Sequence, residues 1–265
     1  MTSQYAGGNA NVYEQMMGRW SQRLARSFLD FAAIGDVHSV LDMGCGTGSL
    51  AFALADAAPK ARIVGIDASQ VFVDYAKSRA SDPRLTFEQG DATALPYADH
   101  ALSAALSLLV LNFVPGYEKA AREMLRVTKP GGVVAASVWD FRGGLTYMRM
   151  FLDTAAALDP NGDATRSKIY SMPLIAPDEL GRLWTTVGLR EVRQTSLTIR
   201  MDFHSFADYW EPWLGGQGTV GPYAASLEGE KKATIEHHLR LAYLAGGQDG
   251  PRSFAATAWA VRGVR

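Results

Sequence analysis

The chain has 265 residues, enough for one large α/β domain with a substantial hydrophobic core. Its 26 basic side chains are balanced by 27 acidic ones, and this near-neutral charge disfavours nucleic acid as a partner. A single cysteine excludes an internal disulfide, and the longest apolar run, ALSAALSLLVLNFV, is shorter than the ~20 residues that a membrane helix needs. The start of the chain lacks the basic end and apolar centre of a secretory signal, so we expect a soluble, cytoplasmic protein with no membrane partner.

The first half of the chain alternates predicted strands with predicted helices. Trp20, Leu24, Phe28 and Phe31 recur at helical spacing ahead of the first strand. The run 101–109 is apolar throughout, as expected for a strand that is buried on both faces of a parallel sheet. Such alternation predicts a mostly parallel sheet with helices on both faces. In chain order, we expect a helix over 11–33, a strand over 39–43, a helix over 49–58, a strand over 62–67, a helix over 69–80, strands over 85–91 and 101–109, a helix over 117–127 and a strand over 133–138.

The second half of the chain has fewer predicted strands and a long helical insertion. Residues 190–201 alternate like a strand, and the chain closes on another strand at 253–265. Between them lie two helical stretches, 205–215 and 223–246, joined by the flexible sequence GGQGTVGP. We therefore expect residues 204–250 to form a helical lid inserted before the last strand. Helices are also predicted over 143–158 and 177–189.

Three glycines alternate directly after the first predicted strand, in the sequence DMGCGTG at 42–48. A main chain without Cβ atoms lets a ligand approach closely, and the start of the next helix presents unpaired N–H groups. A dinucleotide-binding loop would place its third glycine where Ser49 stands, and a phosphate-binding P-loop would need a lysine that is absent here. The pattern that remains is acidic-x-Gly-x-Gly-x-Gly.

This pattern resembles the first motif of the class I S-adenosylmethionine-dependent methyltransferases. GIDAS at 65–69 is similar to that family's second-strand motif, FEQGDATALPY at 87–97 to its third, and LRVTKPGG at 125–132 to the turn before its fifth strand. The resemblance covers roughly residues 38–140. It implies an α/β fold with a Rossmann-like, doubly wound, mostly parallel seven-stranded sheet, and S-adenosyl-L-methionine as the cofactor. LPYADHALSAALSLLVLNFV is most similar to the small-molecule enzymes related to ubiquinone and menaquinone C-methyltransferases.

The resemblance also implies roles for single residues at the strand ends. Asp67 would accept hydrogen bonds from the ribose diol, and Asp91 would take the adenine amino group, with the Ala92 N–H beside it. Asp42 would lie close to the amino group of the methionine part, and Arg19 would reach its carboxylate. Simpler interpretations stay open: Gly44 and Gly46 as a tight turn only, Asp67 as a cap of the following helix, Asp91 as a turn residue, and Arg19 as a surface arginine. The full set of expected cofactor-binding residues is Arg19, Asp42, Gly44, Cys45, Gly46, Thr47, Gly48, Asp67, Ala68, Gly90, Asp91, Ala92 and Leu108.

The methyl acceptor is harder to derive from the residues. Leu111-Asn112-Phe113 stands where enzymes that methylate amino groups commonly carry an Asn/Asp-Pro-Pro-aromatic loop, so we expect a small organic acceptor. The expected reaction is in-line displacement, with His204 as the candidate catalytic base and no metal. The nucleophilic atom and the oligomeric state stay open, and so do two alternatives, a non-catalytic S-adenosylmethionine-binding protein and a nicotinamide-dependent oxidoreductase. Aromatic residues expected near the pocket are Tyr13, Trp20, Trp139, Tyr170, Tyr209, Trp210 and Trp213.

The chain is expected to form one domain made of three parts. Residues 1–37 would be an N-terminal helical segment that covers the cofactor site. Residues 38–203 and 251–265 would make the methyltransferase core, and 204–250 the lid.

Overall fold

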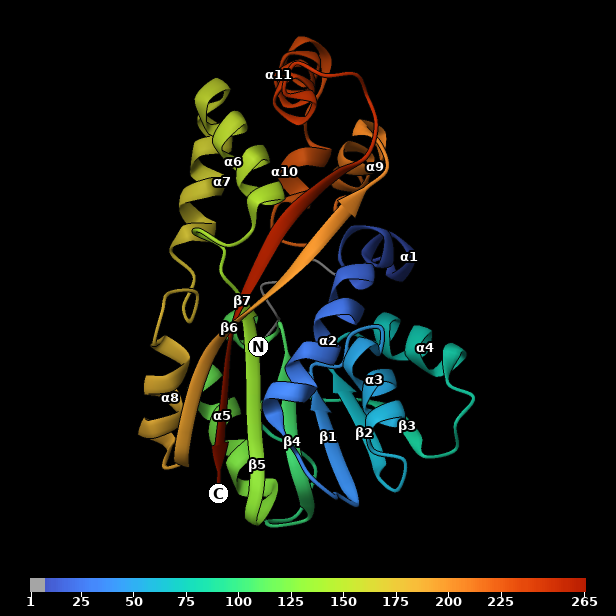
Figure 1. The fold of residues 1–265 in the computed structure, drawn as a ribbon, viewed down its shortest axis with the longest axis vertical. Coiled ribbons are helices and arrows are strands. Elements are labelled where there is room, and N and C mark those ends of the chain that lie inside the picture. The colour runs from blue at the N-terminus through green and yellow to red at the C-terminus, as the bar shows by residue number, and fades with distance from the viewer. Residues whose placement is uncertain (1–7) are drawn as a thin grey trace.

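The computed structural model describes residues 8–265, which are built around one seven-stranded sheet (Figure 1). The strand order is β3-β2-β1-β4-β5-β7-β6. This arrangement confirms the Rossmann-like, mostly parallel α/β class expected from the sequence. The strands are β1 (Ser39–Met43), β2 (Arg62–Asp67), β3 (Leu85–Gln89), β4 (Leu102–Leu108), β5 (Thr128–Trp139), β6 (Arg190–Phe203) and β7 (Arg252–Val264).

The order of the strands reverses at β1. Strands β1 to β5 pair in parallel, and β7 lies antiparallel between β5 and β6. The chain first builds outward from β1 through β2 to β3, and then crosses back to place β4 on the other side of β1. Ligands of open α/β sheets bind beyond the carboxyl ends of the strands at such a reversal. The topology therefore places the candidate ligand site at the ends of β1 and β4.

Helices cover both faces of the sheet, because neighbouring residues of a strand point to opposite sides. Val40 of β1 packs into the core beneath α2, α3 and α4. Leu41, the next residue, packs into the core shared with α5 and α8. The covering helices are α2 (Arg19–Ala32), α3 (Ser49–Ala57), α4 (Gln70–Arg79), α5 (Tyr117–Val127) and α8 (Glu179–Val187).

A layer of helices stands beyond the carboxyl ends of the parallel strands, where the long strands β6 and β7 extend toward it (Figure 1). The insertion expected at 204–250 supplies much of this layer. Helices α6 and α7 join it from the segment before β6, since α6 packs on α7 and α11, and α7 packs on α10. We call this layer the helical cap; it comprises α6 (Thr146–Leu158), α7 (Pro160–Tyr170), α9 (Phe206–Trp210), the 3-10 turn η3 (Glu211–Gly215), α10 (Gly221–Ala225) and α11 (Gly229–Leu244).

Two parts of the cap differ from the sequence-based expectation. Helix α7 was not predicted, although Asp159 caps it by accepting a hydrogen bond from the Asn161 N–H at 3.2 Å, and Pro160 occupies its first turn. The single helix expected over 223–246 is divided into α10 and α11. The division coincides with Gly229, whose φ of +54° lies in the left-handed region.

The helix expected over 11–33 is present but contains a wider turn. It consists of α1 (Ala10–Tyr13), the π-helical turn η1 (Glu14–Gly18) and α2, which follow one another without a break. Single π-helical turns of this kind are frequent at functional sites. Residues 1–7 of the expected N-terminal segment lie outside the described residues. From residue 8 onward, no helix is both long and apolar enough to cross a bilayer.

Candidate functional site

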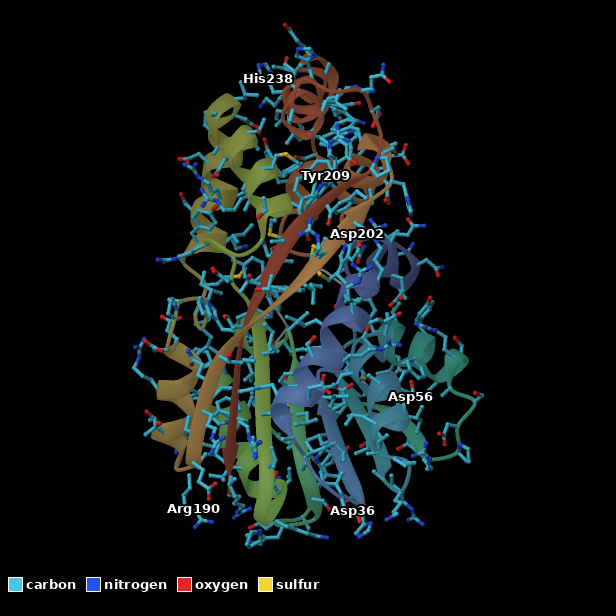
Figure 2. The ribbon with its side chains drawn as sticks, viewed as in Figure 1. Asp36, Asp56, Arg190, Asp202, Tyr209 and His238 are labelled. Carbon is cyan, nitrogen blue, oxygen red and sulfur yellow. The ribbon has the colours of Figure 1, made fainter. Side chains whose placement is uncertain are left out.

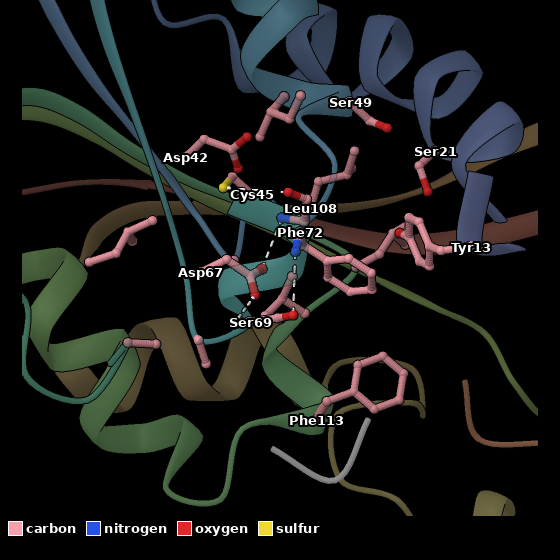
Figure 3. Close-up of a pocket in the computed structure, with 18 of the residues that line it drawn as sticks. Tyr13, Ser21, Asp42, Cys45, Ser49, Asp67, Ser69, Phe72, Leu108 and Phe113 are labelled. Carbon is pink, nitrogen blue, oxygen red and sulfur yellow. Dashed lines mark hydrogen bonds between the residues drawn. The ribbon is translucent and has the colours of Figure 1, made fainter. Parts of the chain in front are cut away.

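A pocket opens at the carboxyl ends of β1 to β4, where the topology places a ligand site (Figure 3). It holds about 970 Å³ of empty space, part of it open to solvent. Figure 3 shows Asp42 and Asp67 on one side and the rings of Tyr13, Phe72 and Phe113 gathered on another. Of the residues expected from the sequence, the lining includes Asp42, Gly44, Cys45, Gly46, Asp67, Ala68, Gly90, Ala92 and Leu108. Lining residues that the motifs did not indicate are Ser21, Ser49, Leu50, Ile66, Ser69, Phe72, Leu109, Val110 and Phe113.

The glycine loop bends sharply between β1 and α3. Its first N–H groups, those of Gly44 and Cys45, donate to the carbonyl of Ile66 at 2.7 and 3.0 Å, which ties the loop to β2. Gly44 has φ of +76°, and a Cβ there would lie 2.4 Å from Cγ1 of Val110. Only glycine fits both the dihedral angle and the space. Burial raises the pKa of the Cys45 thiol, so this side chain stays protonated and is no nucleophile at neutral pH.

Asp67 connects the glycine loop to the start of α4. Its Oδ2 accepts a hydrogen bond from the Gly46 N–H at 2.9 Å, and its Oδ1 accepts one from the Ser69 N–H at 2.8 Å. Burial raises the pKa of Asp67, and these two hydrogen bonds oppose the rise. The side chain therefore does cap the following helix, and it also lines the pocket. A carboxylate oxygen accepts more than one hydrogen bond, so both oxygens still have capacity for a ligand.

Asp42 is the most isolated carboxyl group of the pocket. The residue is 1 % exposed, and neither oxygen has a hydrogen-bond partner among the described residues. Burial raises its pKa to about 8, and the negative charge of Asp67 adds to the rise. The nearby Ala51 N–H opposes the rise, without the geometry of a regular hydrogen bond. A buried group with no partner is poorly stabilised, and a cationic ligand group would stabilise its charged form.

The third motif, at 87–97, has some residues in the pocket lining and others on the protein surface. Gly90 and Ala92 line the pocket, whereas Asp91 is exposed and absent from the lining. Its Oδ1 accepts hydrogen bonds from both the N–H and the hydroxyl of Thr93, each at 2.8 Å. These bonds lower the pKa of Asp91 and hold its carboxylate against its own loop.

Arg19 and His204 are not brought to the pocket. The guanidinium of Arg19 pairs with Asp208 of the cap at 2.8 Å and lies 4.4 Å from the centroid of the Trp20 ring. His204 is exposed at the end of β6, and its backbone N–H donates to Asp208 at 2.9 Å. Neither residue lines either of the two cavities at this site.

Thr47 and Gly48 belong to the glycine loop but do not line the pocket. Thr47 is buried and donates its hydroxyl hydrogen to Glu14 of the π-helical turn. Gly48 begins α3 with φ of +94°, and a Cβ there would lie 2.6 Å from the ring of Phe52. Both were expected in the cofactor site, and neither is part of the lining.

A second, smaller cavity adjoins the first and shares Tyr13, Leu109 and Phe113 with it. It holds about 420 Å³ of empty space, and we call it the apolar cavity. Three of the aromatic residues expected near a pocket, Tyr13, Trp139 and Trp213, line one cavity or both. The remaining residues that line the apolar cavity are Met16, Met17, Phe141, Met148, Gln217, Gly218, Thr219 and Val220.

Fold and site together define an α/β protein with a ligand pocket at the topological switch point of its sheet. A family model described as a methyltransferase domain matches residues 40–132. An uncharacterised protein of Mycobacterium tuberculosis is 26 % identical over 222 residues, which is 82 % of this chain and 79 % of that protein. A demethylmenaquinone methyltransferase of Halalkalibacterium halodurans is 40 % identical over 101 residues, 37 % of this chain and 41 % of that protein. The crystal structure of a putative methyltransferase from Bacillus halodurans matches with a TM-score of 0.58 at 16 % identity, over 91 % of this chain and 97 % of that one.

Residues 40–132 match the methyltransferase domain family, and the curated relatives support a class I S-adenosylmethionine-dependent methyltransferase with S-adenosyl-L-methionine as its cofactor. This confirms the family and the cofactor expected from the glycine pattern and the three later motifs. Among the described residues, no cluster of three or more histidine, cysteine or acidic side chains is arranged to hold a metal ion.

Proposed function

We propose that the protein transfers a methyl group from S-adenosyl-L-methionine to a small organic acceptor by direct in-line displacement. The observation that carries this proposal is the contact between the two cavities, which share Tyr13, Leu109 and Phe113. A donor in the pocket and an acceptor in the apolar cavity would meet at these three side chains. Alignment and exclusion of water are the main tasks of such a site, because the donor is already reactive.

The residues of the pocket fit the cofactor. Asp42, whose buried oxygens lack partners, would hold the ammonium group of the methionine part. Asp67 would accept hydrogen bonds from the ribose hydroxyls. At Gly46 nothing lies within 4 Å of an added Cβ, so the bare main chain leaves room for a ligand beside it, and the apolar side chains of Leu50 and Phe72 would cover a flat base.

When bound, the cofactor supplies a methyl group on a positively charged sulfur; an acceptor lone pair forms the new bond as the carbon–sulfur bond breaks and its electron pair returns to sulfur. Burial raises the pKa of Tyr13 to about 12, so its hydroxyl stays protonated at neutral pH and is no base. Among the described residues, the lining of the apolar cavity includes no acidic side chain, histidine or lysine. Neither Tyr13 nor the rest of this wall would therefore act as a base toward the acceptor.

The test combines cofactor binding with a search for turnover. Calorimetry should show saturable binding of S-adenosylmethionine and of S-adenosylhomocysteine. A metabolite extract supplied with methyl-labelled cofactor should yield a labelled small product together with S-adenosylhomocysteine. Tight cofactor binding without any labelled product would support the non-catalytic alternative instead. Saturable NAD binding with no affinity for S-adenosylmethionine would support the oxidoreductase.

A further inference from the structure

The apolar cavity differs from the pocket in the chemistry of its wall, and this difference bears on the acceptor. The inference rests on the proposed function. We propose that the apolar cavity is the acceptor site and that it selects an uncharged, largely apolar molecule that carries a hydrogen-bond-accepting oxygen.

The wall of the apolar cavity lacks charge. Met16, Phe141, Met148 and Val220 are buried and supply hydrocarbon and thioether surface. Within the described chain, its lining includes no Asp, Glu, Lys, Arg or His. Arg19, the cation expected near the site, is already paired with Asp208. A carboxylate or an ammonium group that entered this cavity would lose its water without gaining a counter-charge.

Two indole groups are among the polar groups of the cavity wall, beside those of Tyr13, Gln217 and Thr219. Trp139 and Trp213 are each 2 % exposed, and both line the cavity. In residues 8–265, the indole N–H of Trp139 has no hydrogen-bond partner, and that of Trp213 lies near the Tyr209 hydroxyl without the geometry of a regular hydrogen bond. A buried N–H without a partner is costly, and an oxygen atom on a ligand would satisfy it. Because an indole N–H only donates, these groups favour a carbonyl, ether or hydroxyl oxygen and disfavour a cation.

Most of this wall lies outside the matched methyltransferase domain. That domain covers residues 40–132, which include Leu109 and Phe113 but none of the other lining residues. Apart from Trp139 and Phe141, which lie at the end of β5 and just after it, the rest comes from two parts, the N-terminal helix and the cap region. Gln217 of the cap region accepts a hydrogen bond from the N–H of Gly8, just ahead of the N-terminal helix, at 2.9 Å. At Gly215 of η3, an added Cβ would lie 2.2 Å from Cγ1 of Val12, so the two parts are in close contact. Acceptor selection would therefore depend on segments outside the matched methyltransferase domain.

Three probes of similar size test the charge preference: acetophenone, benzoate and benzylammonium. Each is titrated into the full chain saturated with S-adenosylhomocysteine, and ligand-observed NMR gives the dissociation constant. We expect acetophenone to bind about tenfold or more tightly than either charged probe, because each charged probe must be desolvated without a partner. Equal or tighter binding of benzoate or benzylammonium overturns the proposal.

Matched variants locate the probe. Trp213→Phe keeps an aromatic ring and removes the N–H. It should therefore weaken the binding of acetophenone and leave the binding of ethylbenzene unchanged. Thr219→Lys adds a cation to the wall and should reverse the preference toward benzoate, whereas Thr219→Met, of similar length and uncharged, should not. Unchanged preferences in both Trp213→Phe and Thr219→Lys would place the probe elsewhere and overturn the assignment of the cavity.

The failure of this inference is distinguishable from failure of the proposed function. S-adenosylhomocysteine affinity is measured for every variant, and all of them should keep it because the changed residues lie outside the cofactor pocket. If the protein binds the cofactor but prefers a charged probe, the proposed function stands and this inference is wrong. If the protein does not bind the cofactor, both the proposed function and this inference are wrong. The comparison of the three probes on the unaltered chain decides the charge preference even if a variant does not fold.

Discussion

Glu14 accepts a hydrogen bond from the hydroxyl of Thr47, which joins the π-helical turn to the glycine loop. The same carboxylate lies 3.6 Å from the guanidinium of Arg79 on α4 and accepts a hydrogen bond from the side chain of Gln22 at 3.2 Å. The N-terminal helix is thereby tied to two elements that surround the pocket. Since Tyr13 and Ser21 of this helix line the pocket, Glu14 positions one of its walls.

Glu14→Ala should loosen that wall. Removing a charge-assisted hydrogen bond and an ion pair should weaken S-adenosylhomocysteine binding by about three- to tenfold, mainly through faster dissociation. Stopped-flow measurement of the dissociation rate checks this expectation. Glu230→Ala, which changes an exposed glutamate of the cap, is the matched control and should leave the rate unchanged. An unaltered dissociation rate in Glu14→Ala would mean that the helix does not restrain the cofactor.

Asp67→Ala should weaken binding of S-adenosylmethionine by more than about tenfold, since the change removes a charge-assisted acceptor and leaves the Gly46 and Ser69 N–H groups without their partner. Calorimetry gives the affinity. Asp56→Ala is the control, because Asp56 is exposed on α3 and lies at the outside of the molecule (Figure 2). Equal affinity in the two variants would remove Asp67 from the cofactor site.

Asp42 should make the stability of the cofactor-free protein fall as pH rises. Its pKa is about 8 in the folded chain and near 3.8 in the unfolded chain. Between these values the folded protein keeps a proton that the unfolded chain releases, so the free energy of unfolding decreases by up to about 1.4 kcal/mol per pH unit. The raised pKa of Asp67 acts in the same direction. Urea unfolding from pH 4 to 8 should show this slope, and Asp42→Asn should reduce it.

The same group should make cofactor affinity depend on pH in the opposite sense. An ammonium group binds the ionised form of Asp42, so affinity should rise as the pH approaches about 8. In Asp42→Asn, binding should be weaker, and the increase with pH should be smaller. A variant that binds as well as the unaltered chain at pH 8 would contradict the role of Asp42.

Gly44→Ala should destabilise the protein more than Gly131→Ala does. Both glycines have positive φ, +76° and +79°, so both variants incur strain of about 1–2 kcal/mol. Only at Gly44 does the new Cβ meet a neighbour, the side chain of Val110 at 2.4 Å. This crowding should cost about 1–3 kcal/mol more in the free energy of unfolding and weaken cofactor binding. Urea unfolding and calorimetry of the two variants provide the comparison.

His204→Ala should have little effect. The side chain is exposed at the end of β6 and lines neither cavity. Cofactor affinity and the rate of product formation should stay within about twofold, as is usual for substitutions at exposed sites. A much larger loss of rate, with cofactor affinity retained, would restore His204 as a candidate base.

The local patterns of the chain predicted most of its secondary structure. The mostly apolar runs at 39–43 and 101–109 correspond to β1 and β4, because a strand buried on both faces is rich in apolar residues. Helix α7 was missed because its helical pattern is weak, even though Asp159 and Pro160 mark its start. The π-helical turn was not foreseen either, because it depends on contacts such as that between Glu14 and Thr47, which lie 33 residues apart.

The motifs also predicted the cofactor half of the site more fully than the acceptor half. Asp42, Gly44 and Asp67 follow directly from strand ends and a bend, so their places are set within short stretches of chain. Phe113 and Met148 carry no such local signal. Phe113 belongs to the 3-10 turn Leu111–Phe113 after β4 and Met148 to α6, and only the tertiary fold places both in one cavity.

By itself, the sequence determined the family, the cofactor and the strand ends that form the pocket, because alternation, glycine spacing and acidic residues act over a few residues each. Tertiary structure alone decided that Arg19 pairs with Asp208 instead of reaching the pocket. It also decided that Trp139 and Trp213 share one cavity, although 74 residues separate them in the sequence. Long-range packing between segments that are distant in the sequence sets these relationships, and no local pattern encodes them.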